Sequence, residues 1–119
     1  MKPSSAKAKG RETENLAADF AALCTSWPIE RRRTNGPKDR GDLAGFPTWL
    51  AVEVKSSIGE LDKGMDQAMT EAVNAEAQYP LLVCRRKRSD VARWYAGMPY
   101  LQMLQLIMEL DGYKGEANT

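Results

Sequence analysis

Apolar and polar residues alternate with two different periods along the chain, and these periods predict a helix at each end with strands between them. Between residues 10 and about 27, apolar side chains recur at steps of four, three and four, as on one face of a helix: Leu16, Phe20, Leu23 and Trp27. Pro28 is predicted to end this helix.

Strand patterns follow in the middle of the chain. The predicted strands cover residues 29–34, 42–44, 49–56, 81–84 and 91–96. The clearest is 49–56, where Leu50, Val52 and Val54 share one face while Glu53 and Lys55 share the other. The turn Gly45-Phe46-Pro47 predicts a hairpin between the second and third strands.

Two further helices are predicted. In the first, over residues 61–76, the expected apolar stripe comprises Leu61, Met65, Ala68, Met69, Ala72 and Val73. The acids of this segment are expected on its outer face: Glu60, Asp62, Asp66, Glu71 and Glu76. The last helix begins after Pro99 and has one narrow polar stripe (Gln102, Gln105 and Glu109), which predicts burial on nearly all sides, by a partner subunit or by the chain itself.

The order helix, strand, strand, strand, helix, strand, strand, helix predicts an α/β fold with a mixed β-sheet flanked by helices. A chain of 119 residues fits one domain. We expect that domain to cover residues 10–111, with loose tails at 1–9 and 112–119.

The composition excludes several chemistries. The sequence contains no histidine, which rules out an imidazole base and Ser-His or Cys-His nucleophiles. Cys24 and Cys84 each lie in an apolar stretch, and we expect buried thiols in a reducing compartment. No apolar run is long enough for a membrane span and no hydrophobic signal segment opens the chain, so a cytoplasmic location without a membrane is expected.

Charge is segregated along the chain, although the formal net charge is only +1. The first basic cluster consists of Arg31, Arg32, Arg33, Lys38 and Arg40, and the second of Arg85, Arg86, Lys87, Arg88 and Arg93. If the fold brings them together they suit a phosphate backbone. The alternative is that each cluster is a solvated loop.

The candidate chemistry lies on the third predicted strand. Glu53 and Lys55 emerge on the same face, and the hairpin would return Glu53 close to Asp42. Two carboxylates and an ammonium at a sheet edge suit Mg²⁺ and a phosphate. The alternative is a cross-strand ion pair between Glu53 and Lys55 on an exposed face.

Three segments resemble the PD-(D/E)XK nuclease superfamily: Lys9-Gly10-x-x-x-Glu14, the run from Asp39 to Pro47, and the run from Trp49 to Lys55. Within it, the chain is most similar to archaeal-type Holliday junction resolvases and their small phage-encoded relatives, over about residues 9–110. The resemblance implies a restriction-endonuclease-like fold. Glycine precedes Asp42 where the superfamily's name has proline.

The resemblance also implies residue roles. Asp42 and Glu53 would ligate Mg²⁺, or Mn²⁺ in its place, together with the Val54 carbonyl, and Lys55 would orient the attacking water or stabilise phosphorane charge. Glu14 matches the family's helical glutamate, with Glu12 as its competitor. Arg33 and Thr34 fall at phosphate-contact positions, and Gln67 at that of a supporting polar residue. Both basic clusters are expected to contact DNA (Arg31, Arg32, Arg33, Thr34, Lys38, Arg40, Arg85, Arg86, Lys87 and Arg88).

The expected function is a metal-dependent endonuclease that resolves four-way DNA junctions as a homodimer. Two other functions fit the same residues. One is a nuclease of the same superfamily acting on flaps, nicks or duplex, and the other is a non-catalytic nucleic-acid-binding protein.

Overall fold

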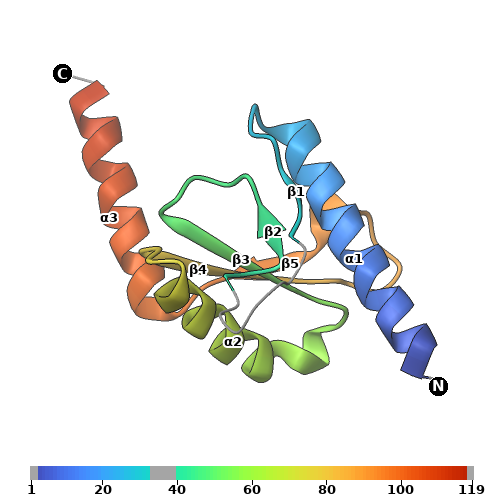
Figure 1. The fold of residues 1–119 in the computed structure, drawn as a ribbon. Helices are drawn as coiled ribbons and strands as arrows, with labels where there is room; N and C mark the ends of the chain where they lie inside the picture. The colour runs from blue at the N-terminus through green and yellow to red at the C-terminus, as the bar shows by residue number, and fades with distance from the viewer. Residues whose placement is uncertain (1–2, 33–39, 118–119) are drawn as a thin grey trace.

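A five-stranded sheet forms the centre of the protein. In the computed structural model, which describes residues 3–32 and 40–117, the strands follow the spatial order β1-β2-β3-β4-β5 (Figure 1). Their bounds are β1 Glu30–Arg31, β2 Leu43–Ala44, β3 Leu50–Lys55, β4 Tyr79–Cys84 and β5 Tyr95–Gly97. The β3–β4 pair is parallel and the other three pairs are antiparallel, so the sheet is mixed and the predicted α/β class and element order are confirmed.

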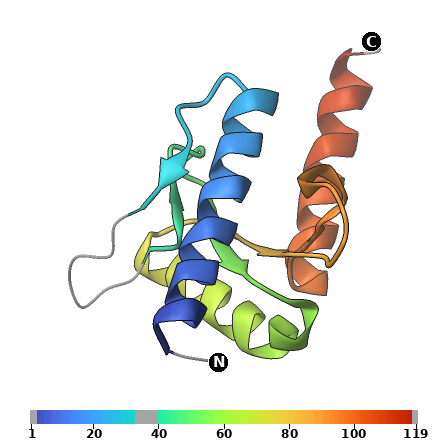
Figure 2. The ribbon, with the colours of Figure 1, turned by 90° about the vertical axis from the view of Figure 1, so that its right-hand side faces the viewer.

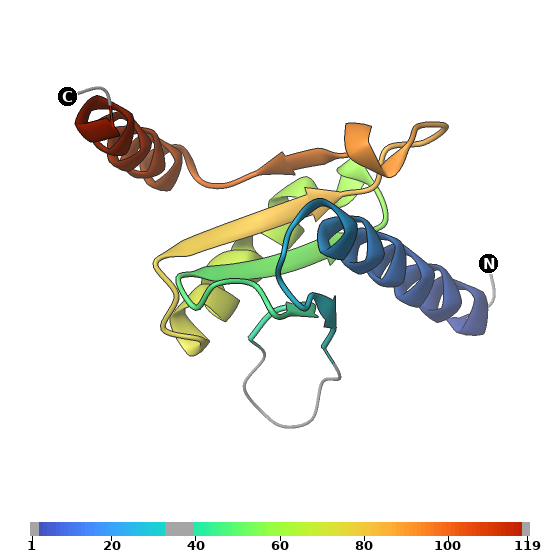
Figure 3. The same cartoon turned by 90° about the horizontal axis from the view of Figure 1, so that it is seen from above.

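Helices cover both faces of this sheet. Figure 3 shows the sheet between α1 (Pro3–Cys24), nearer the viewer, and α2 (Leu61–Asn74), behind it. Helix α1 packs against β1 and β3, while α2 packs against β3 and β4. The third helix, α3 (Tyr100–Ala117), extends away from the sheet. Two single 3₁₀ turns, η1 (Ile58–Glu60) and η2 (Val91–Arg93), complete the described elements.

The two faces of β3 have different environments. Val52 and Val54 belong to the apolar cluster that contains Ala17 and Ala18 of α1. Glu53 and Lys55 alternate with them and therefore lie on the face toward α2. The predicted β2–β3 hairpin is confirmed by the antiparallel pairing of Leu43 with Val52.

The helix faces predicted from large apolar residues are wrong in part. On α2 the buried residues include Gly64, Ala68 and Ala72, whereas Val73 is 76% exposed. A Cβ atom at Gly64 would lie 2.9 Å from Leu82 Cδ1, so small residues allow α2 to approach the sheet closely. Helix α1 shows the same preference: the small residues Thr13, Ala17 and Ala18 are buried, and the predicted core residues Leu23 and Trp27 are exposed.

The tails predicted at 1–9 and 112–119 are helical over residues 3–9 and 112–117. Proline is tolerated in the first turn of a helix, and the alanines and lysines that follow Pro3 favour helix. The first helix also ends at Cys24, three residues before the predicted Trp27.

Strand β4 begins at Tyr79, two residues before the strand predicted over 81–84, and it includes Pro80. Backbone nitrogens point alternately to the two sides of a strand. The Tyr79 N–H donates to the Trp49 carbonyl on the β3 side, so the Pro80 nitrogen points to the β5 side. Pairing with β5 starts only at Leu82, so the missing N–H of proline costs no strand hydrogen bond. The strand predicted over 91–96 is divided into η2 and β5.

The two cysteines have different surroundings. Cys84 is buried as predicted, and burial raises the pKa of its thiol. Cys24 is exposed near the end of α1, contrary to the prediction that both thiols are buried. Within residues 3–32 and 40–117, no helix has the length and apolar character to cross a bilayer.

Candidate active site

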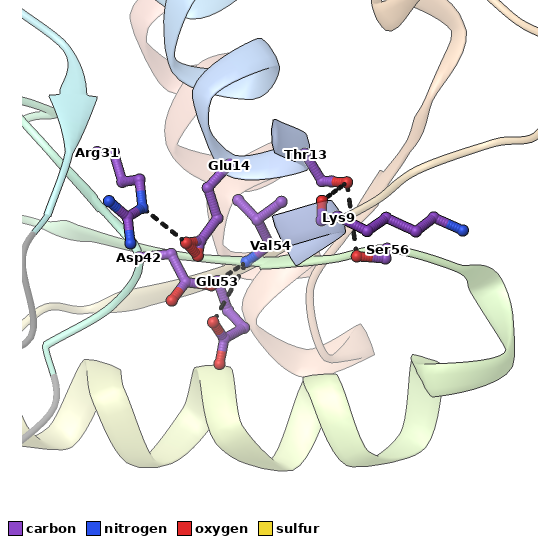
Figure 4. A network of polar contacts seen from close by, with 8 residues as sticks. All are labelled: Lys9, Thr13, Glu14, Arg31, Asp42, Glu53, Val54 and Ser56. Carbon is purple, nitrogen blue, oxygen red and sulfur yellow. Dashed lines mark hydrogen bonds and ion pairs between the residues drawn. The ribbon is translucent and has the colours of Figure 1, made fainter. Parts of the chain in front are cut away.

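The first feature of the site is the contact between Asp42 and the backbone of β3. The Val54 N–H donates to Asp42 Oδ2 at 2.7 Å, and the same N–H lies 3.3 Å from Glu53 Oε1 (Figure 4). The Asp42 N–H in turn donates to the Val52 carbonyl at 2.8 Å. Backbone pairing therefore fixes the Asp42 carboxylate against β3, one residue before β2 begins.

Gly41 makes this arrangement possible. Its φ of +108° is one that side-chain-bearing L-residues rarely adopt, and a Cβ there would lie 2.8 Å from the Val52 carbonyl oxygen. Proline, with φ fixed near −65°, cannot take this conformation. The glycine that stands before Asp42 is therefore required by the local geometry of this chain.

Glu53 is a buried carboxyl group beside other carboxylates. It is 4% exposed, and burial, above all, raises its pKa to about 7. Hydrogen bonding with Asp42 lowers this pKa, whereas hydrogen bonding with Glu71 and its charge raise it. The protein therefore holds Glu53 in a place where a bound cation would relieve the cost of ionising it.

An open cleft of about 500 Å³ contains these groups. Its lining comes from α1, the β2 edge, the end of β3, η1 and α2: Ala6, Lys9, Gly10, Glu14, Asp42, Glu53, Val54, Lys55, Ser56, Ser57, Glu60 and Gln67. Lys55, two residues after Glu53, is half-buried at the C-terminal end of β3. The three residues expected to meet, Asp42, Glu53 and Lys55, thus line one space.

Helix α1 adds a third carboxylate. Glu14 points toward Asp42 in Figure 4, and its Oε1 accepts a hydrogen bond from Arg31 Nε at 3.1 Å. Burial raises the pKa of Glu14 and the Arg31 hydrogen bond opposes this effect. Glu12, the alternative helical glutamate, lies outside the cleft lining and 3.7 Å from Arg85 Nη1. The structure therefore places Glu14, and not Glu12, at the site.

The side chains of the cleft determine which kind of metal site they can form. Among the described residues, no three histidine, cysteine or carboxylate side chains are grouped as a ready-made metal cage. Mg²⁺ seldom needs one, because it is commonly held by one or two carboxylates together with waters and substrate phosphates. Asp42 and Glu53, which meet at the Val54 N–H, match that smaller requirement.

Gln67 supplies an independent indication of a ligand. Its Oε1 is buried and has no hydrogen-bond partner among the described residues, and Gln67 lines the same cleft. A buried polar atom without a partner is costly, and a metal-bound water or an ion would satisfy it. The oxygen donors of the cleft therefore fit a hard divalent cation.

The two basic clusters lie on opposite sides of the site. Arg31 belongs to β1 and Arg40 lies just before β2, whereas residues 85–88 follow β4 on the other side of β3. Arg86, Lys87 and Arg88 are exposed, with the Arg86 guanidinium 5.5 Å from the Tyr95 ring centre. Among the residues that the structure describes, the two groups are therefore separated by β3 in the sheet. Arg33, Thr34 and Lys38 lie outside the described residues.

Two basic residues hold α1 in place. Arg31 binds Glu14, and Arg85 Nη1 donates to Thr13 Oγ1 at 3.1 Å while its guanidinium stacks over Trp94. Arg32 is half-buried, and its Nε lacks a hydrogen-bond partner within the described chain. Both Arg31 and Arg85 therefore position the helix that carries Glu14, a role that charge patterning did not indicate.

Sequence reasoning missed Glu71. This residue was expected on the outer face of α2, but it is 3% exposed and interacts with Glu53. A signal was present: Gly64, Gln67 and Glu71 are spaced by three and four residues, so they share one helix face. That face carries the polar groups that α2 contributes toward β3.

The chain was compared with protein-family models, with curated proteins and with solved structures, and none of the three comparisons found a match.

Proposed function

We propose that this protein is a metal-dependent DNA endonuclease that cleaves four-way junctions by phosphodiester hydrolysis. The observation that carries the proposal is the meeting of Asp42 and Glu53 at the Val54 N–H, with Lys55 lining the same cleft. This combination of a half-buried and a buried carboxylate, a lysine and an open cleft suits Mg²⁺ beside a phosphate.

Each residue has a defined part in this proposal. Asp42 and Glu53, with the Val54 carbonyl, would hold Mg²⁺ or Mn²⁺, and Gln67 would satisfy a water bound to it. When bound, such an ion lowers the pKa of a water and neutralises charge that builds on the phosphate. Glu14 would complete the acidic side of the cleft, with Arg31 holding its carboxylate in place.

The proposal gives Lys55, which lines the same cleft, a role at the phosphate. Its ammonium would orient the attacking water or offset negative charge in the transition state, where preorganised charge has its largest effect. The strand position two residues after Glu53 fixes it on the same face as that carboxylate. A cross-strand ion pair on an exposed face is a poorer explanation, because Glu53 is buried.

DNA binding is assigned to the flanking basic residues. Arg32 follows β1 and Arg40 precedes β2, whereas Arg86, Lys87 and Arg88 follow β4, on the other side of β3. Two separated positive surfaces suit a substrate with more than one duplex arm, because each can neutralise the phosphates of a different arm. The preference for junctions further rests on the resemblance of the three sequence segments to junction resolvases. A homodimer acting in the cytoplasm is part of the same proposal.

The deciding experiment compares substrates at equal concentration. A labelled four-way junction, a 5′ flap, a nicked duplex and a linear duplex of the same sequence are incubated with the protein in Mg²⁺, in Mn²⁺ and in EDTA. We expect symmetric cuts in the junction with either cation, none in EDTA, and at least tenfold slower cutting of the linear substrates.

Other results would change the assignment in defined ways. Equal or faster cleavage of flap or duplex would place the protein among nucleases with another substrate. Absence of cleavage on every substrate, together with junction binding and no Mn²⁺ uptake by calorimetry, would favour a non-catalytic binding protein. Cleavage that persists in EDTA would contradict the metal-dependent site.

A further inference from the structure

Helix α3 is attached to the protein by Glu109 and by the half-buried Gln102, Met103 and Leu106, and it exposes a second apolar side to solvent. Glu109 Oε1 accepts hydrogen bonds from Tyr79 Oη at 2.8 Å and from Gln78 Nε2 at 3.2 Å, which attaches the helix to the start of β4. Residues on the opposite side of the helix are exposed, among them Tyr100 at 78% and Met108 at 72%. The predicted burial on nearly all sides is therefore wrong for the single chain.

The exposed apolar residues form one continuous stripe. At about 100° per residue, five of them fall within an arc of about 120°. These five are Tyr100, Leu101, Leu104, Ile107 and Met108. An arc of this width is what an amphipathic helix normally buries against a core. Figure 2 shows α3 standing beside the body of the molecule as a separate column.

The exposed area has the size of a protein interface. With exposed fractions between 40% and 78%, the five side chains of the stripe expose roughly 600 Å², taking roughly 200 Å² for a large side chain. A standard dimer interface buries about 800 Å² on each partner, so the stripe would supply most of one partner's share, and monomers rarely expose an apolar patch of this size.

The lack of charge on the stripe favours a second copy of this chain as its partner. Residues 100–110 contain one charged side chain, Glu109, which faces the protein. Lys114 is the only basic residue of α3, beside the acids Glu109, Asp111 and Glu116, so an anionic membrane or a nucleic acid would be repelled. An uncharged apolar stripe is complementary to itself, as a two-fold symmetric contact requires.

We propose that the stripe of Tyr100, Leu101, Leu104, Ile107 and Met108 on α3 is a self-association surface, which packs against the same stripe of a second copy of this chain. Helix α3 is about 27 Å long at about 1.5 Å per residue, enough for a helix pair along its length. The inference rests on exposure and charge alone and does not depend on nuclease activity.

The test measures mass in solution without DNA or metal. Sedimentation velocity of the full chain from 1 to 200 µM should give twice the 13.3 kDa of the monomer. Leu104→Asp, at the centre of the stripe, should raise the dimer dissociation constant at least about 30-fold. The matched control is Gln105→Asp, which adds the same charge one position away, beside the stripe, and should leave the dimer intact.

A second measurement covers the case in which Leu104→Asp disturbs folding. In a Cys24→Ser background, Leu104→Cys should form a disulfide-linked dimer on mild oxidation, whereas Lys87→Cys should not. A wild-type chain that stays monomeric throughout the range, or a dimer unaffected by Leu104→Asp, would overturn the proposal. A monomer that binds vesicles of neutral lipid would also overturn it and assign the stripe to a membrane surface.

Discussion

Asp42, just before β2, and Val54, in β3, are joined by a hydrogen bond of 2.7 Å from the Val54 N–H to Asp42 Oδ2. The same N–H lies 3.3 Å from Glu53 Oε1, so one backbone donor brings two carboxylates together. Burial and the neighbouring Glu71 raise the pKa of Glu53, and hydrogen bonding with Asp42 lowers it, so a bound cation would offset the remaining cost of ionising Glu53. The β2–β3 hairpin therefore holds the two carboxylates next to each other.

Asp42→Asn should abolish cleavage while leaving the fold intact. The amide has nearly the shape of the carboxylate and can still accept from Val54, but it lacks the negative charge that holds a divalent cation. We expect cleavage of the junction to fall about 100-fold or more, with junction affinity within a few-fold of wild type. Gel assays of cutting in Mg²⁺ and of binding in Ca²⁺ measure both. Asp62→Asn, on the exposed side of α2, serves as the control and should cut normally.

Lys55→Ala should reduce the cleavage rate without weakening Mg²⁺ binding, unlike Asp42→Asn. The ammonium is proposed to act on the reacting phosphate, so its loss should reduce the single-turnover cleavage rate about 100-fold or more, with Mg²⁺ affinity retained. The control is Lys63→Ala, which removes the same charge from an exposed position on α2 outside the cleft. Equal losses in the two variants would mean that Lys55 contributes only general positive charge.

The strands and the hairpin could be predicted because their signals are local. Alternation identified β3 and placed Glu53 and Lys55 on one face, and Gly45 and Pro47 marked the turn that brings Asp42 to them. A hairpin needs only short-range information, since its register follows from the turn. The proximity of Asp42 to Glu53 could be predicted for the same reason.

The helix faces could not be predicted in the same way. Apart from Glu71, the buried residues of α1 and α2 are Gly, Ala and Thr, which carry a weak hydrophobic signal, while Leu23 and Val73 are exposed. Close approach of a helix to a sheet selects small residues, and the sequence alone does not show which helix approaches closely. Glu71 was assigned to the outside of α2 through this error.

Glu53 should make the stability of the metal-free protein depend on pH. Its pKa is about 7 in the folded state, above the ordinary value of 4.5, so the folded protein binds more protons between these pH values. The contribution of Glu53 to the free energy of unfolding is therefore fully present below about pH 4.5 and is lost as the pH rises through 7. Glu53→Gln should remove this loss, making the variant more stable than wild type at pH 8 by about 3 kcal/mol.

Urea unfolding at pH 5 and pH 8 in EDTA measures this difference. Glu30→Gln, an exposed carboxyl on β1, provides the matched control and should follow the wild-type pH profile. Saturating Mg²⁺ should restore wild-type stability at pH 8, since the cation favours the ionised carboxyl. Parallel pH profiles for wild type and Glu53→Gln would contradict the buried carboxyl as the source.

The second basic cluster should determine much of the salt dependence of DNA binding. Arg86, Lys87 and Arg88 are exposed beside the cleft, and each phosphate contact contributes about 0.9 to the slope of log K against log salt. Replacing all three by alanine should lower that slope by up to about 2.7 and weaken junction and duplex binding alike. Fluorescence anisotropy between 50 and 300 mM salt measures it, with Lys114→Ala on α3 as the control. An unchanged slope would show that these residues do not contact phosphate.

Gly41→Ala should damage the site through the backbone, because an L-residue at φ +108° is strained and its Cβ would meet the Val52 carbonyl oxygen at 2.8 Å. We expect a loss of at least about 2 kcal/mol in the free energy of unfolding, measured in urea. Cleavage should fall as well, since the chain before Asp42 must move. Gly10→Ala is the matched control: nothing lies within 4 Å of its added Cβ, and alanine in the interior of α1 should stabilise the protein by about 0.5–1 kcal/mol. A Gly41→Ala variant as stable as wild type would show that the hairpin tolerates another path, and that glycine is not what fixes Asp42 against Val54.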